Sequence, residues 1–310
     1  MLRVSGMQVY LPIAEMSVNI LVLLALGGGV GFISGLFGIG GGFLMTPILI
    51  FLGVPPAVAV GTQANQLVGA SLSGVLSHWQ RGGVDTRMGG VMLGGGVVGS
   101  ALGVWIFGIL QRLGQIDAAI SILYVLVLGS VGGLMLVESI KAYRAAKNPA
   151  PALRRLHQHL WMHGLPWKLK FPKSRLYISV FVPLTIGFLG GVIVAIMGVG
   201  GGFFMIPAMV YIVGMPASVV AGTSLFQIIF VTAITALLQA VTNQTVDVFL
   251  ALILLVGGII GTQIGVRFGM NLRGEQSRML MSALILAVAV KLFFDLILTP
   301  SDLYGLEVLR

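Results

Sequence analysis

GLFGIGGGFLMTP occupies residues 35–47, and AIMGVGGGFFMIP occupies residues 195–207. Both stretches contain a glycine run, then an apolar segment, then a proline, Pro47 or Pro207. Each lies in a long apolar region, and glycine frees the backbone to leave helical geometry. The pattern therefore predicts two broken helices, half a chain apart.

The similarity between the two halves continues beyond these stretches. Thr62 and Gln66 match Thr223 and Gln227, each pair one helical turn apart. The dipeptide Val-Asp occurs at 84–85 and again at 246–247, and GGVVGSALGVWI (95–106) matches GGIIGTQIGVRF (257–268). So many matches in the same order indicate an internal duplication.

The composition identifies the solvent in which the chain folds. Of 310 residues, 57% are hydrophobic and 9% are charged, and the mean hydropathy is +1.04. A soluble domain is about a quarter charged, so this surface is suited to lipid. The chain contains no cysteine, which excludes disulfides and thiol chemistry. We expect a helical membrane protein without a cofactor or a bound metal.

Five apolar segments can be read in each half. The predicted fold class is an all-α polytopic membrane protein of two inverted repeats, each with about five helical segments. The first two segments of each repeat form a broken helix or re-entrant hairpin around a Gly-rich tip; whether the short second segment spans the membrane stays open. The expected segments are 18–37, 42–52, 57–79, 88–110 and 118–143 in the first half, and 177–197, 202–213, 217–241, 248–270 and 277–298 in the second.

Basic residues set the expected orientation. The net charge is +9, and nine of the 18 Lys and Arg lie between Lys141 and Arg175, where Asp and Glu are absent. Such a block is typical of a cytoplasmic loop beside anionic lipid headgroups, and nucleic acid is not an expected partner. The expected divisions are an N-terminal extension (1–17), repeat 1 (18–143), a basic cytoplasmic linker (144–176), repeat 2 (177–299) and a C-terminal tail (300–310).

The glycine runs allow three interpretations. A nucleotide-binding loop is disfavoured, because no Lys-Ser/Thr follows the glycines. Close helix packing is the second. The third is a substrate site, in which the exposed N–H groups of a new helix N-terminus attract an anion. Neighbouring polar residues favour the third: Thr62, Gln63, Asn65 and Gln66 in one half, and Thr223, Ser224 and Gln227 in the other. These side chains could instead join helices by hydrogen bonds.

The sequence contains two further patterns. Glycines recur every four residues from Gly95 to Gly103 and from Gly257 to Gly269, which predicts close helix contact. Four ionisable residues near helix ends are candidates for gating or coupling: Arg267, Lys291, Asp295 and His78. Lys291 and Asp295 are four residues apart, so they could neutralise one another or carry a proton.

The duplicated Gly-x-Gly-Gly-Gly, the proline after it and the following Gly-Thr-x-x-x-Gln resemble the TauE/SafE family of membrane transporters, often called sulfite exporters. The resemblance extends over both halves and implies a bacterial inner-membrane transporter of small sulfur-containing anions. Asn65 departs from its repeat, because the second half has Phe226 there. The site that the resemblance implies comprises Gly38, Gly40, Gly41, Gly42, Thr62 and Gln66, with Gly198, Gly200, Gly201, Gly202, Thr223 and Gln227.

The expected function is export of sulfite or an organosulfonate by alternating access around two broken helices. The alternatives are an anion channel and an integral membrane enzyme; an enzyme is disfavoured, because no cluster of ionisable groups surrounds the glycine motif. The expected partners are a small anionic substrate and membrane lipid, and a homodimer stays open.

Overall fold

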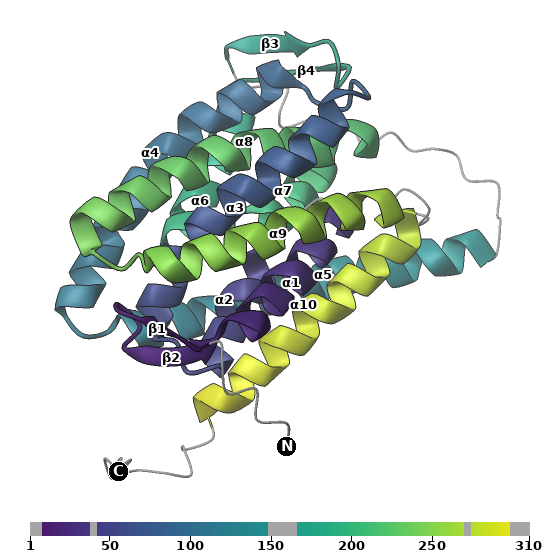
Figure 1. Cartoon of the computed structure of the whole chain (residues 1–310). Helices are drawn as coiled ribbons and strands as arrows, with labels where there is room; N and C mark the ends of the chain where they lie inside the picture. The colour runs from purple at the N-terminus through teal and green to yellow at the C-terminus, as the bar shows by residue number, and fades with distance from the viewer. Residues whose placement is uncertain (1–7, 38–41, 148–165, 270–273, 298–310) are drawn as a thin grey trace, which may run out of the picture.

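The computed structural model describes residues 8–37, 42–147, 166–269 and 274–297, and the order of elements is the same in the two halves (Figure 1). Each half starts with a β-hairpin and continues with helices. The first half contains β1 (Gln8–Leu11), β2 (Met16–Asn19), α1 (Ile20–Phe37), α2 (Gly42–Phe51), α3 (Pro56–Trp79), α4 (Thr86–Arg112) and α5 (Ile116–Lys147). The second contains β3 (Lys168–Phe171), β4 (Leu176–Ser179), α6 (Phe181–Met197), α7 (Gly202–Pro207), η2 (Ala208–Val213), α8 (Ala217–Leu238), η3 (Gln239–Asn243), α9 (Val248–Gly269) and α10 (Gly274–Ile297).

The second glycine run breaks its helix. α6 ends at Met197, and α7 begins at Gly202. Between them Gly198, Gly200 and Gly201 have φ angles of 70°, 72° and 69°. Residues other than glycine rarely adopt this left-handed backbone conformation, so the glycines in the sequence dictate the break. In the first half α1 ends at Phe37 and α2 begins at Gly42, and the intervening residues lie outside the described ranges.

The two β-hairpins were not predicted from the sequence. β1 pairs antiparallel with β2, and β3 pairs antiparallel with β4. Glu15 and Arg175 occupy equivalent turn positions, with φ angles of 53° and 54°. The hairpins lie at opposite ends of the molecule (Figure 1). β3 falls in the stretch expected to be a linker, and its four residues are too few to reveal alternation.

Glycines join the two halves through close helix contacts. α1 packs along α9, and α6 packs along α4, so each pair takes one helix from each half. A Cβ atom on Gly261 would overlap the carbonyl oxygen of Gly28, and one on Gly99 would overlap that of Phe188. The prediction that the four-residue glycine spacing marks close helix contact is confirmed. The halves are therefore interlocked and do not form two separate bundles.

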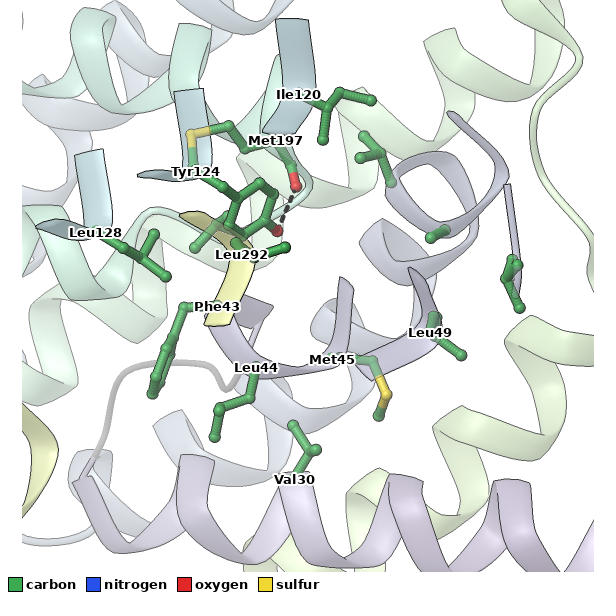
Figure 2. Close-up of a cluster of buried hydrophobic side chains, with 14 of the residues drawn as sticks. Val30, Phe43, Leu44, Met45, Leu49, Ile120, Tyr124, Leu128, Met197 and Leu292 are labelled. Carbon is green, nitrogen blue, oxygen red and sulfur yellow. Dashed lines mark hydrogen bonds between the residues drawn. The ribbon is translucent and has the colours of Figure 1, made fainter. Parts of the chain in front are cut away.

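A buried apolar cluster lies between α2, α5 and α10 (Figure 2). It includes Phe43, Leu128 and Leu292, which are almost fully buried. Tyr124 of α5 lies in the same cluster and donates a 2.7 Å hydrogen bond from its hydroxyl to the carbonyl of Met197. Met197 is the residue before the glycine break, so this bond fixes the end of α6.

Six helices in the described part of the chain are long and apolar enough to cross a membrane: α1, α4, α9, and segments 116–141, 218–243 and 279–297. Three further segments, α2, α6 and α7–η2, are apolar but shorter than these six helices. Many large apolar side chains point outward, among them Trp105, Leu126 and Leu134. Such a surface is suited to hydrocarbon, and the protein is a multi-pass helical membrane protein.

Candidate functional site

The second glycine tip, residues 198–202, lies between α2 and α3. A Cβ atom on Gly42, the first residue of α2, would lie 2.5 Å from the carbonyl carbon and oxygen of Val199. A Cβ atom on Gly198 would lie 2.9 Å from the Cα of Val60 in α3. The structure therefore brings the second tip against the start of α2. The remaining glycines of the first run, Gly38, Gly40 and Gly41, lie outside the described residues.

Three buried glutamines lie on the helices beside the tip. Gln63 and Gln66 belong to α3 and Gln227 belongs to α8, and each is at most 2% exposed. The Oε1 atom of Gln66, the Nε2 atom of Gln63 and both amide atoms of Gln227 have no hydrogen-bond partner within the described residues. An unpaired buried amide costs about 1–3 kcal/mol. These groups are therefore suited to a polar solute.

Gln66 and Gln227 occupy equivalent positions in the two halves. A Cβ atom on Gly258 of α9 would lie 2.7 Å from Nε2 of Gln66, and one on Gly96 of α4 would lie 2.6 Å from Nε2 of Gln227. Each glutamine thus faces the fourth helix of the other half. That the two amides share one cavity stays a prediction.

Thr62 and Thr223 contact the other half of the chain. Oγ1 of Thr62 accepts a 2.9 Å hydrogen bond from the backbone N–H of Asp247, and Oγ1 of Thr223 accepts one of the same length from Asp85. Thr223 also donates to the carbonyl of Val219. Both hydroxyls are fully buried and hold helix ends together. A direct role in substrate binding stays a prediction for both.

The remaining polar candidates differ between the halves. Asn65 lines a pocket of about 430 Å³ beside α8 and α9, and its Nδ2 has no partner in the described part of the chain. Its counterpart Phe226 packs against Trp79 and Phe230. Ser224 donates to the carbonyl of Ala221 in its own helix. The departure noted in the sequence therefore leaves a pocket on one side and an aromatic cluster on the other.

The residues considered for gating or coupling lie in two places. Lys291 and Asp295 form an ion pair at 3.7 Å, which confirms that they can pair, and both side chains are about half exposed. Lys291 also lies 3.1 Å above the ring of Phe51. Arg267 and His78 line neighbouring cavities at the C-terminal ends of α9 and α3. No described residue of α10, the helix that carries the ion pair, lines either cavity.

Asp85 and Asp247 have structural roles in the fold that the sequence analysis did not predict. Oδ1 of Asp85 accepts from the N–H of Met88, which caps α4, and Oδ2 accepts from the N–H and hydroxyl of Ser174 in the β3–β4 turn. Asp247 caps α9 through the N–H of Leu250 and accepts from the N–H of Ile13 in the β1–β2 turn. The repeated Val-Asp before an apolar run was the available signal, because aspartate is a preferred N-cap.

Comparison with known proteins gives one family and several relatives. Residues 23–292 match the family model described as "Sulfite exporter TauE/SafE". "Probable membrane transporter protein YunE" of Bacillus subtilis is 25% identical over 89% of this chain and 98% of its own length. "Probable membrane transporter protein YjnA" of the same organism is 26% identical over 89% and 100%, and a "Probable membrane transporter protein" of Xylella fastidiosa is 29% identical over 80% and 84%. No solved structure matches.

Proposed function

Because the chain belongs to the sulfite exporter TauE/SafE family of membrane transporters, we propose that it exports a small oxyanion of sulfur by alternating access. The substrate class is sulfite or an organosulfonate. Such an anion offers up to three acceptor oxygens, for which amide and backbone N–H groups are suitable neutral donors. Neutral donors hold an anion less tightly than a buried arginine would, which favours release.

The observation that carries the proposal is the set of buried amides beside a broken helix. Gln63, Gln66 and Gln227 have amide atoms without partners in the described residues, and Gly42 contacts Val199 of the glycine tip. Broken helices at matching places in two repeats are typical of a transporter's binding site. Ligand binding there would compensate the unpaired amides.

The arrangement of the halves supports the alternating-access part of the proposal. The hairpins lie at opposite ends of the molecule, as inverted repeats would place them (Figure 1). The bonds Thr62–Asp247 and Thr223–Asp85 are equivalent under the duplication. Two equivalent contacts on different sides of a central site are suited to opening one at a time.

The proposed orientation follows the basic residues. The linker stretch 144–176 would lie in the cytoplasm of a bacterium, against anionic headgroups of the inner membrane. β3 contributes Lys168 and Lys170 to this surface, and both are exposed. The β1–β2 hairpin would then lie on the outer side.

Flux measurements in proteoliposomes test the function. Sulfite and sulfoacetate uptake is compared between wild type, Gln66→Leu/Gln227→Leu and the control Gln115→Leu, whose side chain is exposed in the turn before α5. Loss of two hydrogen bonds to an anion, each worth about 1.5–3 kcal/mol, should slow uptake at low substrate at least tenfold. Wild-type vesicles impermeable to every sulfur anion tested would contradict the function. Wild-type uptake rates in the double variant would exclude the two glutamines from the binding site but would not contradict the transport function.

A further inference from the structure

We propose that the groove between α3 and α9 is an anion-binding vestibule, through which a small sulfonate or related oxyanion reaches the buried amides. The groove has a volume of about 600 Å³. Six polar or basic residues line it: Ser73 and Ser77 from α3, Gln80 and Arg81 from the turn that follows α3, and Gln263 and Arg267 from α9. The inference rests on the proposed function for the identity of the anion.

Helical spacing explains how these side chains reach one groove. Ser73, Ser77 and Arg81 recur every four residues along one face of α3 and its C-terminal turn, and Gln263 and Arg267 do the same on α9. Residues four apart lie on the same side of a helix. Two polar stripes therefore face one another. Polar residues facing hydrocarbon are costly, so this groove is suited to water and a dissolved anion.

Both arginines are available to a solute. Arg81 and Arg267 are exposed, and the ion pair found among the described residues is Lys291–Asp295, which involves neither. Two cations without a carboxylate partner in that part of the chain make the groove electropositive. Guanidinium groups also match the geometry of oxyanions, because their N–H donors are arranged in a planar fork.

The groove leads toward the buried amides. Its lining begins at Gly69, less than one turn from Gln66, and ends at Arg81, about 18 Å further along at 1.5 Å per residue. Ile259 of α9 also lines it, next to Gly258 against which Gln66 lies. A second cavity of about 230 Å³ is also lined by Arg81 and extends to Gly35 in α1, near the first glycine run.

The duplicated groove at the other end of the molecule lacks this character. It lies between α4 and α8, with a volume of about 260 Å³. Trp105 and Thr242 occupy the positions that match Arg267 and Arg81, and Leu238 matches Ser77. One arginine, Arg112, lines this second groove. The comparison within one chain shows that the two-arginine groove is specialised.

Cysteine labelling tests the vestibule without requiring transport. The chain has no cysteine, so Ser77→Cys and its counterpart Leu238→Cys each introduce a single thiol. An anionic and a neutral methanethiosulfonate are compared at each thiol. We expect the ratio of the anionic to the neutral labelling rate to be higher for Ser77→Cys than for Leu238→Cys. Adding Arg81→Gln or Arg267→Gln should reduce that preference roughly fivefold each, as expected for one charge nearby in water. Arg87→Gln, an exposed arginine outside the groove lining, should leave it unchanged.

Methanesulfonate supplies the ligand in the same assay. It should slow labelling of Ser77→Cys and not of Leu238→Cys, and Arg81→Gln/Arg267→Gln should abolish the protection. Equal anionic preference in the two grooves, or no protection, overturns the vestibule. An unchanged KM for sulfonate flux in the double arginine variant would also overturn the vestibule, but it would leave the proposed transport function intact. Protection without any flux supports the anion site and counts against the transport function.

Discussion

Asp247 and Thr62 are 185 residues apart in the chain, and the backbone N–H of Asp247 donates a 2.9 Å hydrogen bond to the hydroxyl of Thr62. Asp85 and Thr223 make the equivalent bond, also at 2.9 Å. Each bond joins the third helix of one half to the N-cap of the fourth helix of the other. The two threonines therefore fasten the halves together at two separate places.

Replacing either threonine should destabilise the protein. Thr62→Val or Thr223→Val keeps the shape of the side chain and leaves a buried aspartate N–H unpaired, at a cost of about 1–3 kcal/mol in the free energy of unfolding. Denaturation in detergent measures this. The control is Thr185→Val, whose hydroxyl donates, among the described residues, to the nearby Val182 carbonyl alone and whose loss should cost less than about 0.5 kcal/mol. Equal stability of all three variants would contradict the fastening role.

Two glycine substitutions within α4 should distinguish the effect of helix packing on stability from the effect of helix propensity. Gly99→Ala would place a methyl group against the carbonyl of Phe188, so α4 and α6 must move apart. Gly94→Ala meets nothing within 4 Å and should stabilise the helix by about 0.5–1 kcal/mol. Thermal denaturation should therefore shift in opposite directions for the two variants. A gain in stability for Gly99→Ala would show that the contact is loose.

Tyr124→Phe should loosen the end of α6. The change removes the hydroxyl that donates to the Met197 carbonyl and keeps the aromatic ring in the cluster of Figure 2. A lost hydrogen bond of this kind costs about 0.5–1.5 kcal/mol. Hydrogen exchange of the peptide that contains the second glycine tip should become faster, while exchange in α9 stays constant. Unchanged exchange at the tip would show that the phenol does not hold it.

The Lys291–Asp295 pair should matter little if it only neutralises charge. Both groups are about half exposed, and exposed ion pairs contribute about 0.2–1 kcal/mol. Asp295→Asn should therefore change stability only slightly and leave sulfonate flux and its pH dependence unchanged in proteoliposomes. A flux that no longer responds to a proton gradient in Asp295→Asn would instead assign the pair to proton coupling.

The sequence was most informative where one residue type has one structural use. The glycine run predicted the break at residues 198–201, because only glycine adopts that backbone conformation without strain. The four-residue glycine spacing predicted the contact of α4 with a neighbour, although it could not name α6, because spacing carries no information about the partner. Because the motifs are duplicated, the same predictions could be made for both halves.

Short strands escaped prediction, and the partners of buried polar side chains could not be named from the sequence. Each strand of the hairpins has four residues, too few for an alternating pattern to stand out. The sequence leaves open whether Thr62 binds substrate or joins helices, because its hydrogen bond to Asp247 depends on contacts across the two halves that a linear pattern does not encode. The groove could not be predicted for the same reason. Arg81 and Arg267 line one cavity because α3 lies beside α9, and the sequence does not show that these two helices are neighbours.

The exchange of helices between the halves has a consequence for how the protein can assemble. Because α1 needs α9 and α6 needs α4, a protein of half this length could bury its glycine faces only against a second copy of itself. A single repeat is therefore not an independent folding unit in this architecture, and the two repeats have to assemble together.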